Sequence, residues 1–548
     1  MDPVDDKPTQ SRSSVANARS GIVIIGAGIG GISTAIALIE KLGFHDFIMY
    51  EKADDVGGTW RDNTYPGCAC DVSSHWYSLS TEINPDWTQR YAQQPEILQY
   101  WKSLTTKHNL SSYIQLHTLV TNAIWDSSAQ EYIITTKDAH SGVQQTTRAR
   151  IIISAIGGFV APSYPVEISG KEQFQGRMWH SSRWRHDVPL QGLRVGVIGN
   201  GASAAQIIPE IAKDATTTIV NFCRTPSWFI PREQFSYSKT TRWIFRYIPL
   251  VARLYRAVIM ARHDVNYFAL WPKKSEKTRK IVRKRLIEYI KSLAPKEYHE
   301  QLIPTYPPGC KRLVLDPGYL KSLRQPNVSL NWDAIKEVTP TGLRMQGGNV
   351  VDLDVIVFAT GYVFISNELE VTGSKGITIR EYWERQKGPT AYLGTTMSGF
   401  PNYFTLLGPN TATGHASVIF SEESQINYIL KMVKPVLDGD ASSFEVSAEA
   451  SEAYNRDLQE RLSRTVWTDC RSFYRSGGRH DGKVVATFPG TLTQFWWLTR
   501  SVRWEDYIGV NAESWMEKRK RGSVGRITLM SMVTALCLML WGVPRLRK

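Results

Sequence analysis

Cysteine is scarce in this chain: there are six among 548 residues, and no two form a Cys-x-x-Cys pair. The closest two, Cys68 and Cys70, have a single residue between them, which fits neither a zinc knuckle nor a thioredoxin-type redox centre. The scarcity excludes a disulfide-stapled miniprotein and predicts a reducing compartment. We expect no metal site and no disulfide framework.

The chain has a net positive charge, but the excess of Lys and Arg is confined to two segments. The net charge is +14. Residues 231–300 hold 17 Lys and Arg against 6 Asp and Glu, and residues 515–548 hold 8 against 1. The remainder is therefore mildly acidic, which argues against a nucleic-acid partner and for two local contacts with anions. The apolar content of 42% is typical of a folded protein, and the length suits two to four domains of about 100–200 residues.

The N-terminus lacks an apolar stretch, whereas the C-terminus has one. Residues 1–20 are polar, so we expect no signal peptide, a disordered start and a first ordered element near Gly21. Residues 527–543 carry no charge and have Lys and Arg on both sides. Because spanning a bilayer takes about 17–20 apolar residues, this run favours a single-pass membrane anchor over a terminal core helix. The anchor would leave the body of the protein in the cytosol, with the endoplasmic reticulum as one candidate membrane.

Two segments carry the glycine pattern of dinucleotide-binding folds. In the first, an apolar strand at 22–25 is followed by Gly26-Ala27-Gly28-Ile29-Gly30-Gly31, a helix, and a strand that ends in Glu51. Gly26 permits the tight turn, Gly28 lets a pyrophosphate approach the backbone, and Gly31 lets helix and strand pack closely. Glu51 stands where a carboxylate would bind an adenosine ribose, so the segment predicts FAD or NAD.

The second segment differs from the first at its acidic position. A strand at 194–198 leads into a glycine turn, and the following strand is succeeded by Cys223-Arg224-Thr225 instead of an acid. An arginine there offers a fork for a 2′-phosphate, which predicts NADPH. Donors at the start of the intervening helix would meet the pyrophosphate. The residues expected to contact this cofactor are Gly199, Gly201, Ala202, Ser203, Gln206, Arg224 and Thr225.

An FAD-type fold followed by an NADP-type fold indicates a flavoprotein, and two longer motifs make the assignment specific. Residues 57–71 fit [A/G]GxWxxxx[F/Y]PGxxxD at every fixed position, and residues 174–184 fit FxGxxxHxxxW. On these motifs the sequence resembles the type I Baeyer–Villiger monooxygenases, closest to the branch of 4-hydroxyacetophenone monooxygenase-like and fungal enzymes. The resemblance covers about residues 20–510. The sequence departs from the family at Arg185, where the family has Pro or Asp.

The resemblance implies an activity and a set of site residues. Enzymes of this family reduce FAD with NADPH, form a C4a-peroxyflavin with dioxygen and insert one oxygen atom beside a ketone carbonyl, giving an ester or lactone. Arg312 is then the catalytic arginine, and Asp71 holds it by a charge-assisted pair. Lys311 would join Arg224 at the 2′-phosphate, and His180 would help to position the nicotinamide. The other implied cofactor contacts are Gly58, Thr59, Trp60, Asp71, Tyr77, Gly408 and Asn410.

The predicted fold class is α/β, with two Rossmann-like dinucleotide-binding domains for FAD and NADP, a helical insert and a C-terminal transmembrane helix. The expected order is a disordered terminus (1–20), the first part of the FAD domain (21–165), a linker with the second fingerprint (166–192), the NADP domain (193–350) with a basic helical insert (240–300), the second part of the FAD domain (351–515), and a basic stretch with the anchor (516–548).

The basic insert admits two interpretations. Between residues 242 and 256, four arginines fall on one arc of a helix that Pro249 would kink, with apolar side chains opposite: Arg242, Arg246, Arg253 and Arg256. Residues 277–293 combine one apolar stripe with densely basic faces. The insert is either a solvated helical subdomain or an interfacial surface that lies on anionic lipid.

Other functions remain as alternatives. The same scaffold could oxidise a nitrogen or sulfur atom or hydroxylate its substrate, and Arg185 and Phe473 keep this open, since relatives carry Trp at the second position of Ser472-Phe473-Tyr474. A disulfide reductase would need a redox cysteine pair, which the sequence lacks. A non-catalytic scaffold would have lost the phosphate glycines or Arg312. The family branch favours a hydrophobic, secondary-metabolite-like ketone as substrate.

Overall fold

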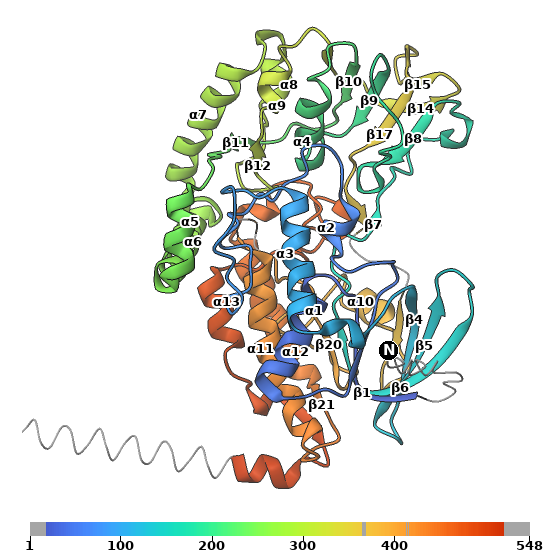
Figure 1. Ribbon diagram of the computed structural model, residues 1–548, viewed down its shortest axis with the longest axis vertical. Helices are drawn as coiled ribbons and strands as arrows, with labels where there is room; N and C mark the ends of the chain where they lie inside the picture. The colour runs from blue at the N-terminus through green and yellow to red at the C-terminus, as the bar shows by residue number, and fades with distance from the viewer. Residues whose placement is uncertain (1–17, 364–368, 413, 415, 520–548) are drawn as a thin grey trace, which may run out of the picture.

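The computed structural model describes residues 18–363, 369–412, 414 and 416–519. The expected anchor at 527–543 and residues 1–17 of the expected disordered start lie outside these ranges. Residues 18–20 are described and belong to β1. Among the described residues, no helix is both long and apolar enough to cross a membrane. The chain forms two sheet-containing lobes, one above the other in Figure 1, with a group of helices along one side.

The lower lobe is built on an eight-stranded sheet in the order β19-β4-β5-β6-β1-β2-β3, with β20 paired to β6. At its centre, β1 lies parallel to both β2 and β6, and the apolar run Ile22–Ile25 is buried there. A strand buried on both faces reads as a continuous apolar run, which is why the sequence identified it. The strands are β1 (Ala18–Ile25), β2 (Phe47–Tyr50), β3 (Ile114–Gln115), β4 (Thr118–Asp126), β5 (Glu131–Asp138), β6 (Gln144–Ser154), β19 (Glu370–Thr372) and β20 (Tyr403–Thr405).

The upper lobe is built on a five-stranded parallel sheet in the order β13-β10-β9-β17-β8. It reaches further along the chain than the expected 193–350, since β8 comes from the expected linker and β17 from beyond residue 350. The reason is burial: all four residues of β17 are inaccessible, and the strand fits between β9 and β8. The strands are β8 (Arg177–His180), β9 (Arg194–Ile198), β10 (Thr218–Phe222), β13 (Val328–Asn331) and β17 (Val355–Phe358).

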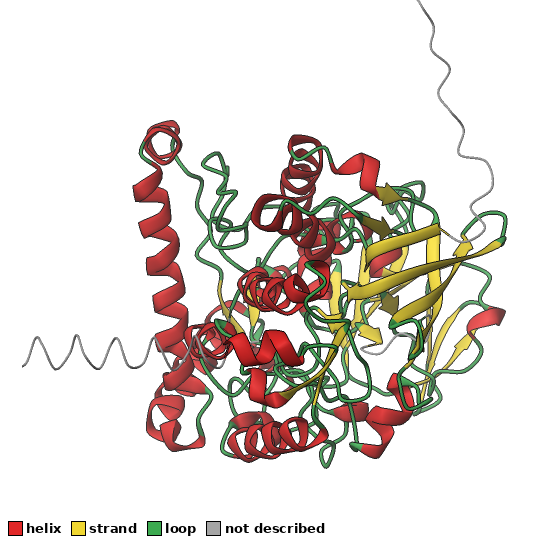
Figure 2. Ribbon diagram, turned by 90° about the horizontal axis from the view of Figure 1, so that it is seen from below, coloured by secondary structure: helices red, strands yellow, loops and turns green. Residues whose placement is uncertain are grey.

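Helices α5 (Lys239–Tyr247), α6 (Pro249–Leu270) and α7 (Glu276–Leu293) form the expected insert. Figure 2 shows helices gathered on the side of the molecule away from the strands. Pro249 does not kink one long helix; it occupies the first turn of α6, where the missing N–H costs nothing. Arg256 corrects the expected basic arc, because its side chain is buried against the lower lobe.

The remaining elements connect these units. The helices are α1 (Ile29–Leu42), α2 (Thr59–Asp62), α3 (Gln94–Lys107), α4 (Ala202–Ile211), α8 (His299–Leu302), α9 (Tyr319–Ser322), α10 (Ile379–Arg385), α11 (Val418–Leu437), α12 (Ala448–Ser463) and α13 (Leu492–Thr499). The short strands are β7 (Ala161–Pro162), β11 (Phe229–Pro231), β12 (Val314–Asp316), β14 (Ile335–Thr339), β15 (Gly342–Met345), β16 (Val350–Asp352), β18 (Tyr362–Val363), β21 (Ser443–Val446) and β22 (Tyr507–Val510).

In the part of the chain that the structure describes, Cys310 and Cys470 form a disulfide that the sequence did not predict. The two cysteines are 160 residues apart, so no local spacing in the sequence predicts the bond. Cys68, Cys70 and Cys223 are buried free thiols. The sequence predicted no disulfide framework and a reducing compartment, and the bond between Cys310 and Cys470 was not among its predictions.

Candidate active site

Both glycine turns have the geometry that a dinucleotide requires. Gly26 has φ +102°, and a Cβ there would lie 2.9 Å from the carbonyl oxygen of Ala155. Gly199 has φ +110°, and a Cβ there would lie 2.5 Å from the carbonyl oxygen of Ala359. Only glycine fits either position without displacing the backbone. The helices that follow, α1 and α4, have no side-chain hydrogen bond at their N-caps, Gly28 and Gly201, and the first N–H groups of a helix suit a pyrophosphate.

The first fingerprint closes over the first glycine turn. Gly28 and Gly58 face each other so closely that a Cβ on Gly58 would lie 3.0 Å from the Cα of Gly28. Gly31 packs on the turn itself, where a Cβ would lie 1.9 Å from the carbonyl oxygen of Gly26. Thr59 begins α2 directly after Gly58. The structure thus brings the predicted FAD contacts of the two motifs together.

Glu51 lies beside this turn, as predicted. Its Oε2 accepts a hydrogen bond of 2.8 Å from the backbone of Ala27, and its Oε1 accepts one of 3.0 Å from Arg61. The side chain is buried. A carboxylate has about four acceptor positions, so capacity remains for a ribose hydroxyl. Arg61 is a residue that sequence reasoning missed, because it occupies a variable position of the fingerprint.

Trp60 and Tyr77 form one wall. The indole Nε1 of Trp60 donates to the hydroxyl of Tyr77 over 3.2 Å, and the two buried rings meet edge to face at 5.7 Å. Burial raises the pKa of Tyr77 well above its ordinary value, so its hydroxyl stays protonated. These two predicted residues therefore supply an aromatic surface held rigid by one hydrogen bond.

Gln206 corrects a prediction. Its Nε2 donates to the carbonyl oxygen of Ala69 over 3.0 Å, and its Oε1 accepts from the hydroxyl of Tyr65 over 3.0 Å. The amide is therefore committed to the fingerprint loop and is not directed at a pyrophosphate. The reason is that the inner face of α4 packs on this loop, as a Cβ on Gly67 would lie 2.5 Å from the backbone oxygen of Gln206. Gln206 joins the two lobes, whereas Ala202 and Ser203 stay at the start of α4.

Arg312 and Asp71 meet from segments 241 residues apart in sequence. The guanidinium donates through Nη2 over 2.6 Å and through Nε over 3.1 Å, both to Asp71 Oδ2. Loss of water contact acts to lower the pKa of Arg312, but the Asp71 carboxylate outweighs it and the pKa is raised. The side chains are 29% and 30% exposed, so the fixed positive charge can still reach a substrate.

Tyr474 is the third member of this group. Burial raises the pKa of Tyr474 to about 12, while the neighbouring Arg312 charge opposes that rise. Its neutral hydroxyl therefore lies in the field of the guanidinium. Phe473, the residue that replaces a tryptophan of the family, is 52% exposed and packs its ring 4.4 Å from that of Tyr474.

Lys311 and Arg224 form a second positive group. The Nζ of Lys311 lies 4.7 Å from the ring centroid of Tyr306. Burial, followed by the charge of Arg224, lowers the pKa of Lys311. Arg224 is 87% exposed and pairs with Glu167 over 3.0 Å. An anion between Lys311 and Arg224 would offset their mutual repulsion, and a 2′-phosphate fits this requirement. Thr225, the next residue after Arg224, is half-buried.

His180 is inaccessible and lies at the end of β8. Its Nδ1 is 2.9 Å from the hydroxyl of Ser182, and its ring meets that of Tyr362 edge to face at 5.6 Å. Burial lowers the pKa of His180 to about 4, so the imidazole is neutral near pH 7. Tyr362, the first residue of β18, in turn donates to Asn63 over 2.5 Å, which links β18 to the first fingerprint.

Asn410 also departs from its predicted role. Its Nδ2 donates to the carbonyl oxygens of Val484 and Thr487, each over 3.0 Å, and the residue is buried. Both amide hydrogens are therefore used to hold the 484–487 segment. Gly408 packs against the chain at Gly394, where a Cβ would lie 2.4 Å from a carbonyl oxygen. The two amide hydrogens of Asn410 are thus not available to FAD, whereas contacts of its Oδ1 or of the Gly408 backbone with FAD stay predictions.

Glu422, near the start of α11, is a candidate that the sequence did not reveal. The residue is buried, and its Oε1 lies 3.1 Å from where a Cβ on Gly30 would be. Burial, followed by the charge of Glu423, raises the pKa of Glu422 to about 8. A protonated carboxyl beside the first glycine turn can donate a hydrogen bond as well as accept one.

We predict that Glu422→Gln makes stability less dependent on pH. Because the folded state keeps the proton up to about pH 8, while an unfolded glutamate loses it near its ordinary pKa of about 4.3, wild-type stability falls as pH rises between these values. The variant is expected to be more stable than wild type by about 1–4 kcal/mol at pH 8.5, with a difference about 3 kcal/mol smaller or nearly zero at pH 5. Urea unfolding at both pH values measures this, with the exposed Glu452→Gln as control; equal pH profiles would contradict the expectation.

The comparisons with known proteins bear on this geometry. The sequence profile described as "Flavin-binding monooxygenase-like" matches residues 19–375, which include both glycine turns and the Arg312–Asp71 pair. The chain belongs to the flavin-binding monooxygenase-like family. It is 38% identical over 488 residues to a Baeyer–Villiger monooxygenase of Pseudomonas aeruginosa, with 87% of this chain and 89% of that protein covered.

Further relatives and solved structures agree. A Baeyer–Villiger monooxygenase of Streptomyces coelicolor is 34% identical, with 89% of this chain and 92% of that protein covered. The FAD-binding monooxygenase ktnD of Aspergillus niger is 33% identical, with 95% and 87% covered. Cyclohexanone monooxygenase from Rhodococcus, bound to NADP⁺, superimposes with a TM-score of 0.78 at 25% identity, with 90% of this chain and 99% of that chain covered. The prediction of an FAD- and NADPH-dependent monooxygenase of the Baeyer–Villiger type is confirmed.

Proposed function

We propose that this flavin-binding monooxygenase converts a hydrophobic ketone into an ester or lactone, with Arg312 as catalytic residue and Asp71 as its positioning partner. The observation that carries the proposal is the two-donor contact between Arg312 and Asp71, which fixes a permanent cation at the junction of the lobes. Bound FAD supplies the electrons of NADPH and the place where dioxygen is activated.

The residues of the site then have distinct tasks. Arg312 stabilises negative charge that develops on the oxygen atoms of the reaction, and it cannot lose its own proton. Asp71 orients the guanidinium, and the neutral hydroxyl of Tyr474 lies beside it. The neutral His180 packs at the end of β8, where it supports the nicotinamide side through Tyr362. One carbon substituent of the ketone moves from the carbonyl carbon to the inserted oxygen. The inserted oxygen is then bonded to both carbons, as in an ester.

Oxidation of a nitrogen or sulfur atom is the second candidate. Phe473 supports it, because an exposed phenyl ring without a polar group replaces the indole of close relatives on the wall beside Tyr474. Arg185 gives it less support, since its guanidinium pairs with Asp187 over 2.5 Å at the surface. Incubation with NADPH and a panel of ketones, amines and sulfides decides between them. An ester or lactone as main product supports the proposal, and N- or S-oxides with no ester would overturn it.

We predict that Arg224→Gln weakens NADPH binding and leaves NADH use unchanged. Charged hydrogen bonds of this kind contribute about 1.5–3 kcal/mol, so KM for NADPH is expected to rise by about 10- to 100-fold with little change in kcat. Steady-state kinetics with both nucleotides measures the effect. The exposed Arg177→Gln, on β8, is the control, and an unchanged NADPH preference would refute the role of Arg224.

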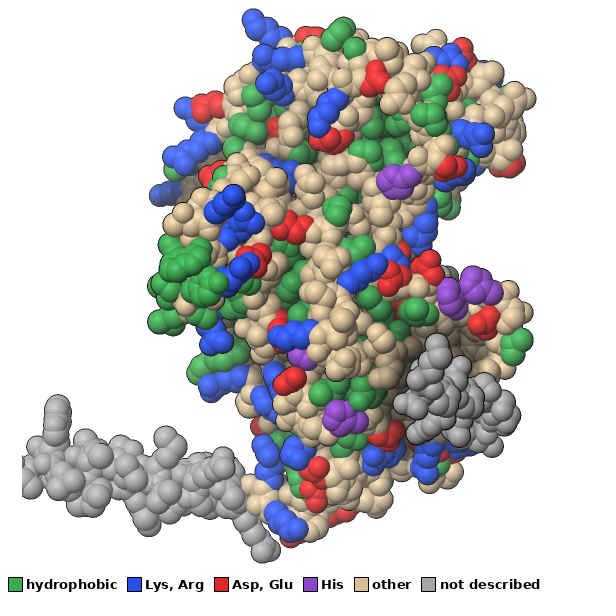
Figure 3. Space-filling view, in the orientation of Figure 1, with side chains coloured by type: hydrophobic (Ala, Val, Ile, Leu, Met, Phe, Trp, Pro, Cys, Tyr) green, Lys and Arg blue, Asp and Glu red, His purple; other side chains and the backbone are tan. Residues whose placement is uncertain are grey.

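We further propose that the protein works at a membrane surface. The uncharged run at 527–543, flanked by Lys and Arg, supports an anchor. An exposed apolar stripe supports a second contact, because its residues recur at helical spacing along α5 and α6: Trp243, Tyr247, Leu250, Leu254, Val258, Val265 and Phe268. Leu250 is 74% exposed. Figure 3 shows these helices covered by hydrophobic side chains, with Lys and Arg above them.

Charge complementarity favours an anionic bilayer as the occupant of this stripe. The only acid between residues 239 and 270 is Asp264, and it is buried at the start of α13, where Thr493 donates to it over 2.6 Å. Arg246, Arg253 and Arg262 border the stripe and are exposed. Aromatic and aliphatic side chains ringed by arginine suit the interface of a membrane that carries phosphatidylserine.

We predict that Leu254→Glu reduces binding to such membranes about tenfold or more, since each charge placed at the interface opposes insertion of the stripe. Flotation with phosphatidylcholine vesicles, with and without phosphatidylserine, measures binding of the full chain and of a chain ending at residue 519. Val166→Glu, a substitution at another exposed site, is the control. The lipid contact is refuted if the shortened chain binds neither type of vesicle. It is also refuted if Leu254→Glu dissociates a dimer and leaves vesicle binding unchanged.

A further inference from the structure

The Cys310–Cys470 disulfide lies two residues before the proposed catalytic arginine. Cys310 precedes Lys311 and Arg312 in the loop that leads into β12, and Cys470 lies four residues before Tyr474. Both half-cystines are buried. The bond therefore joins the loop that carries the fixed cation to the segment that carries the neighbouring tyrosine, with the two Cα atoms 6.2 Å apart.

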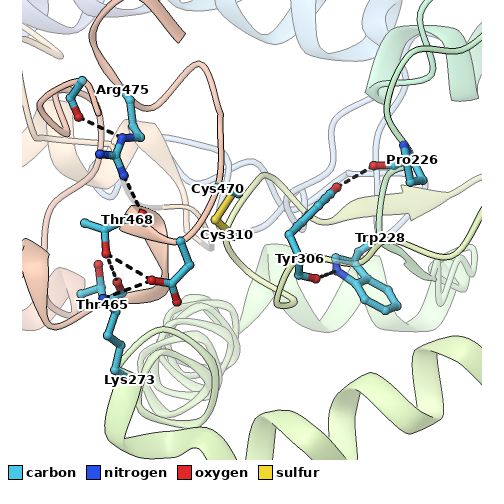
Figure 4. The surroundings of a disulfide bond; sticks show 11 residues. Pro226, Trp228, Lys273, Tyr306, Cys310, Thr465, Thr468, Cys470 and Arg475 are labelled. Atoms are coloured by element: carbon cyan, nitrogen blue, oxygen red, sulfur yellow. Dashed lines mark hydrogen bonds and ion pairs between the residues drawn. A yellow bond between two sulfur atoms is a disulfide. The ribbon is translucent and has the colours of Figure 1, made fainter. Parts of the chain in front are cut away.

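Each half-cystine belongs to a segment with its own set of hydrogen bonds, as Figure 4 shows. On the Cys310 side, Tyr306 donates to the carbonyl of Pro226 over 2.7 Å and accepts at its backbone oxygen from Trp228 over 2.9 Å. These contacts tie the loop to the segment that precedes β11, and the loop continues into β12, where Val314 pairs with Phe229 of β11.

On the Cys470 side, Arg475 is the organising residue. Its Nη1 donates to the carbonyl of Thr468 over 2.8 Å, and its Nε donates to that of Gly482 over 2.9 Å. Lys273, at the α6–α7 junction, pairs with Asp469 over 3.1 Å. This turn is thus rigid in itself, and the disulfide is the covalent connection between it and the Arg312 loop.

We infer that this disulfide is a positioning element for the proposed oxygen insertion, which holds the Arg312 loop in register with the segment that carries Tyr474. The inference rests on the proposed function. A displacement of about 1 Å at a reacting centre can lower the rate by about 100-fold. The Asp71 pair and the Tyr306 contacts hold the Arg312 loop to other parts of the chain, whereas the disulfide fixes it against the segment that carries Tyr474. Without the bond, electrons from NADPH are expected to reach dioxygen but to leave as hydrogen peroxide.

The test compares wild type with Cys310→Ser/Cys470→Ser, each as the FAD-loaded full chain. We expect NADPH oxidation at saturating NADPH within about twofold of wild type and about tenfold less ester per NADPH, with hydrogen peroxide making up the difference. The balance is one NADPH, one proton and one dioxygen to one NADP⁺ and one hydrogen peroxide. Cys223→Ser, which removes a buried free thiol, is the control and is expected to form as much ester per NADPH oxidised as wild type.

Wild type can be tested in the same way if the double variant does not fold. Dithiothreitol supplies two electrons and two protons, so the S–S bond breaks into two thiols and the reagent closes to its cyclic disulfide; glutathione disulfide reverses the change. Coupling should fall on reduction and return on reoxidation, with alkylation and mass spectrometry counting the thiols. The inference is overturned if the ester formed per NADPH is the same with the disulfide formed and reduced, or if both thiols are free in untreated protein. A wild type that makes no ester at all overturns the proposed function, and the inference with it.

Discussion

Arg312→Lys is expected to reduce ester formation by about 10²–10³-fold, the usual cost of removing one electrostatic donor at a reacting centre. Lysine keeps the positive charge but loses the planar fork, so it cannot place two N–H groups on Asp71 as Arg312 does over 2.6 and 3.1 Å. NADPH oxidation should persist, because the predicted nucleotide contacts are made by other residues. Product formed per NADPH, measured by gas chromatography alongside hydrogen peroxide, reports the loss.

Two further variants make this result interpretable. Asp71→Asn should give a smaller loss of the same kind, since the cation remains but is no longer held by a carboxylate. Arg324→Lys, an exposed arginine that contacts the carbonyl of Ser292, should behave like wild type. If Arg312→Lys lowers NADPH oxidation and ester formation equally, Arg312 serves cofactor binding and the proposed catalytic role is wrong.

Arg256→Met is expected to lower the free energy of unfolding by about 3–5 kcal/mol, as breaking a buried ion pair does. The guanidinium donates to the carbonyl of Ser78 over 2.6 Å and pairs with Glu423 over 3.2 Å. Burial lowers the pKa of Arg256, so its environment tolerates the charge only because of these partners. Methionine would leave the Glu423 carboxylate and the backbone carbonyl oxygens without the guanidinium, and α6 would lose one of its buried polar attachments.

Urea unfolding tests this with a matched pair on one helix. Arg253→Met, three residues earlier on α6 and exposed, should change stability by less than about 0.5 kcal/mol. Arg256→Met/Glu423→Met should recover part of the loss, because it removes both charges. Equal effects of the two single substitutions would mean that α6 is held to the lobe by its apolar contacts.

Much of the fold could be predicted because its signals are local. The glycine turns at Gly26 and Gly199 each stand between a buried strand and a helix, and the steric demand that selects glycine acts within a few residues. Glu51 follows from the same unit, since the strand that carries it lies beside the turn. Family membership and both cofactors are confirmed for the same reason, whereas the roles of Arg312, Asp71 and His180 stay predictions.

What the sequence could not provide depends on packing between distant segments. Gln206 faces the fingerprint loop and not a pyrophosphate, because α4 packs on Gly67. Asn410 bonds to residues more than seventy positions away. Arg256 shares a helical arc with exposed arginines, and only the docking of α6 on the lower lobe separates it from them. The partner of Cys310 is likewise set by tertiary structure.

The most direct test of the central claim is product analysis under ¹⁸O₂ with NADPH and a hydrophobic ketone. The account predicts an ester or lactone that carries one ¹⁸O atom, formed in proportion to NADPH oxidised, with the yield lost in Arg312→Lys. Unchanged ketone together with stoichiometric hydrogen peroxide from the wild-type enzyme, or label found only in N- or S-oxides, would contradict it.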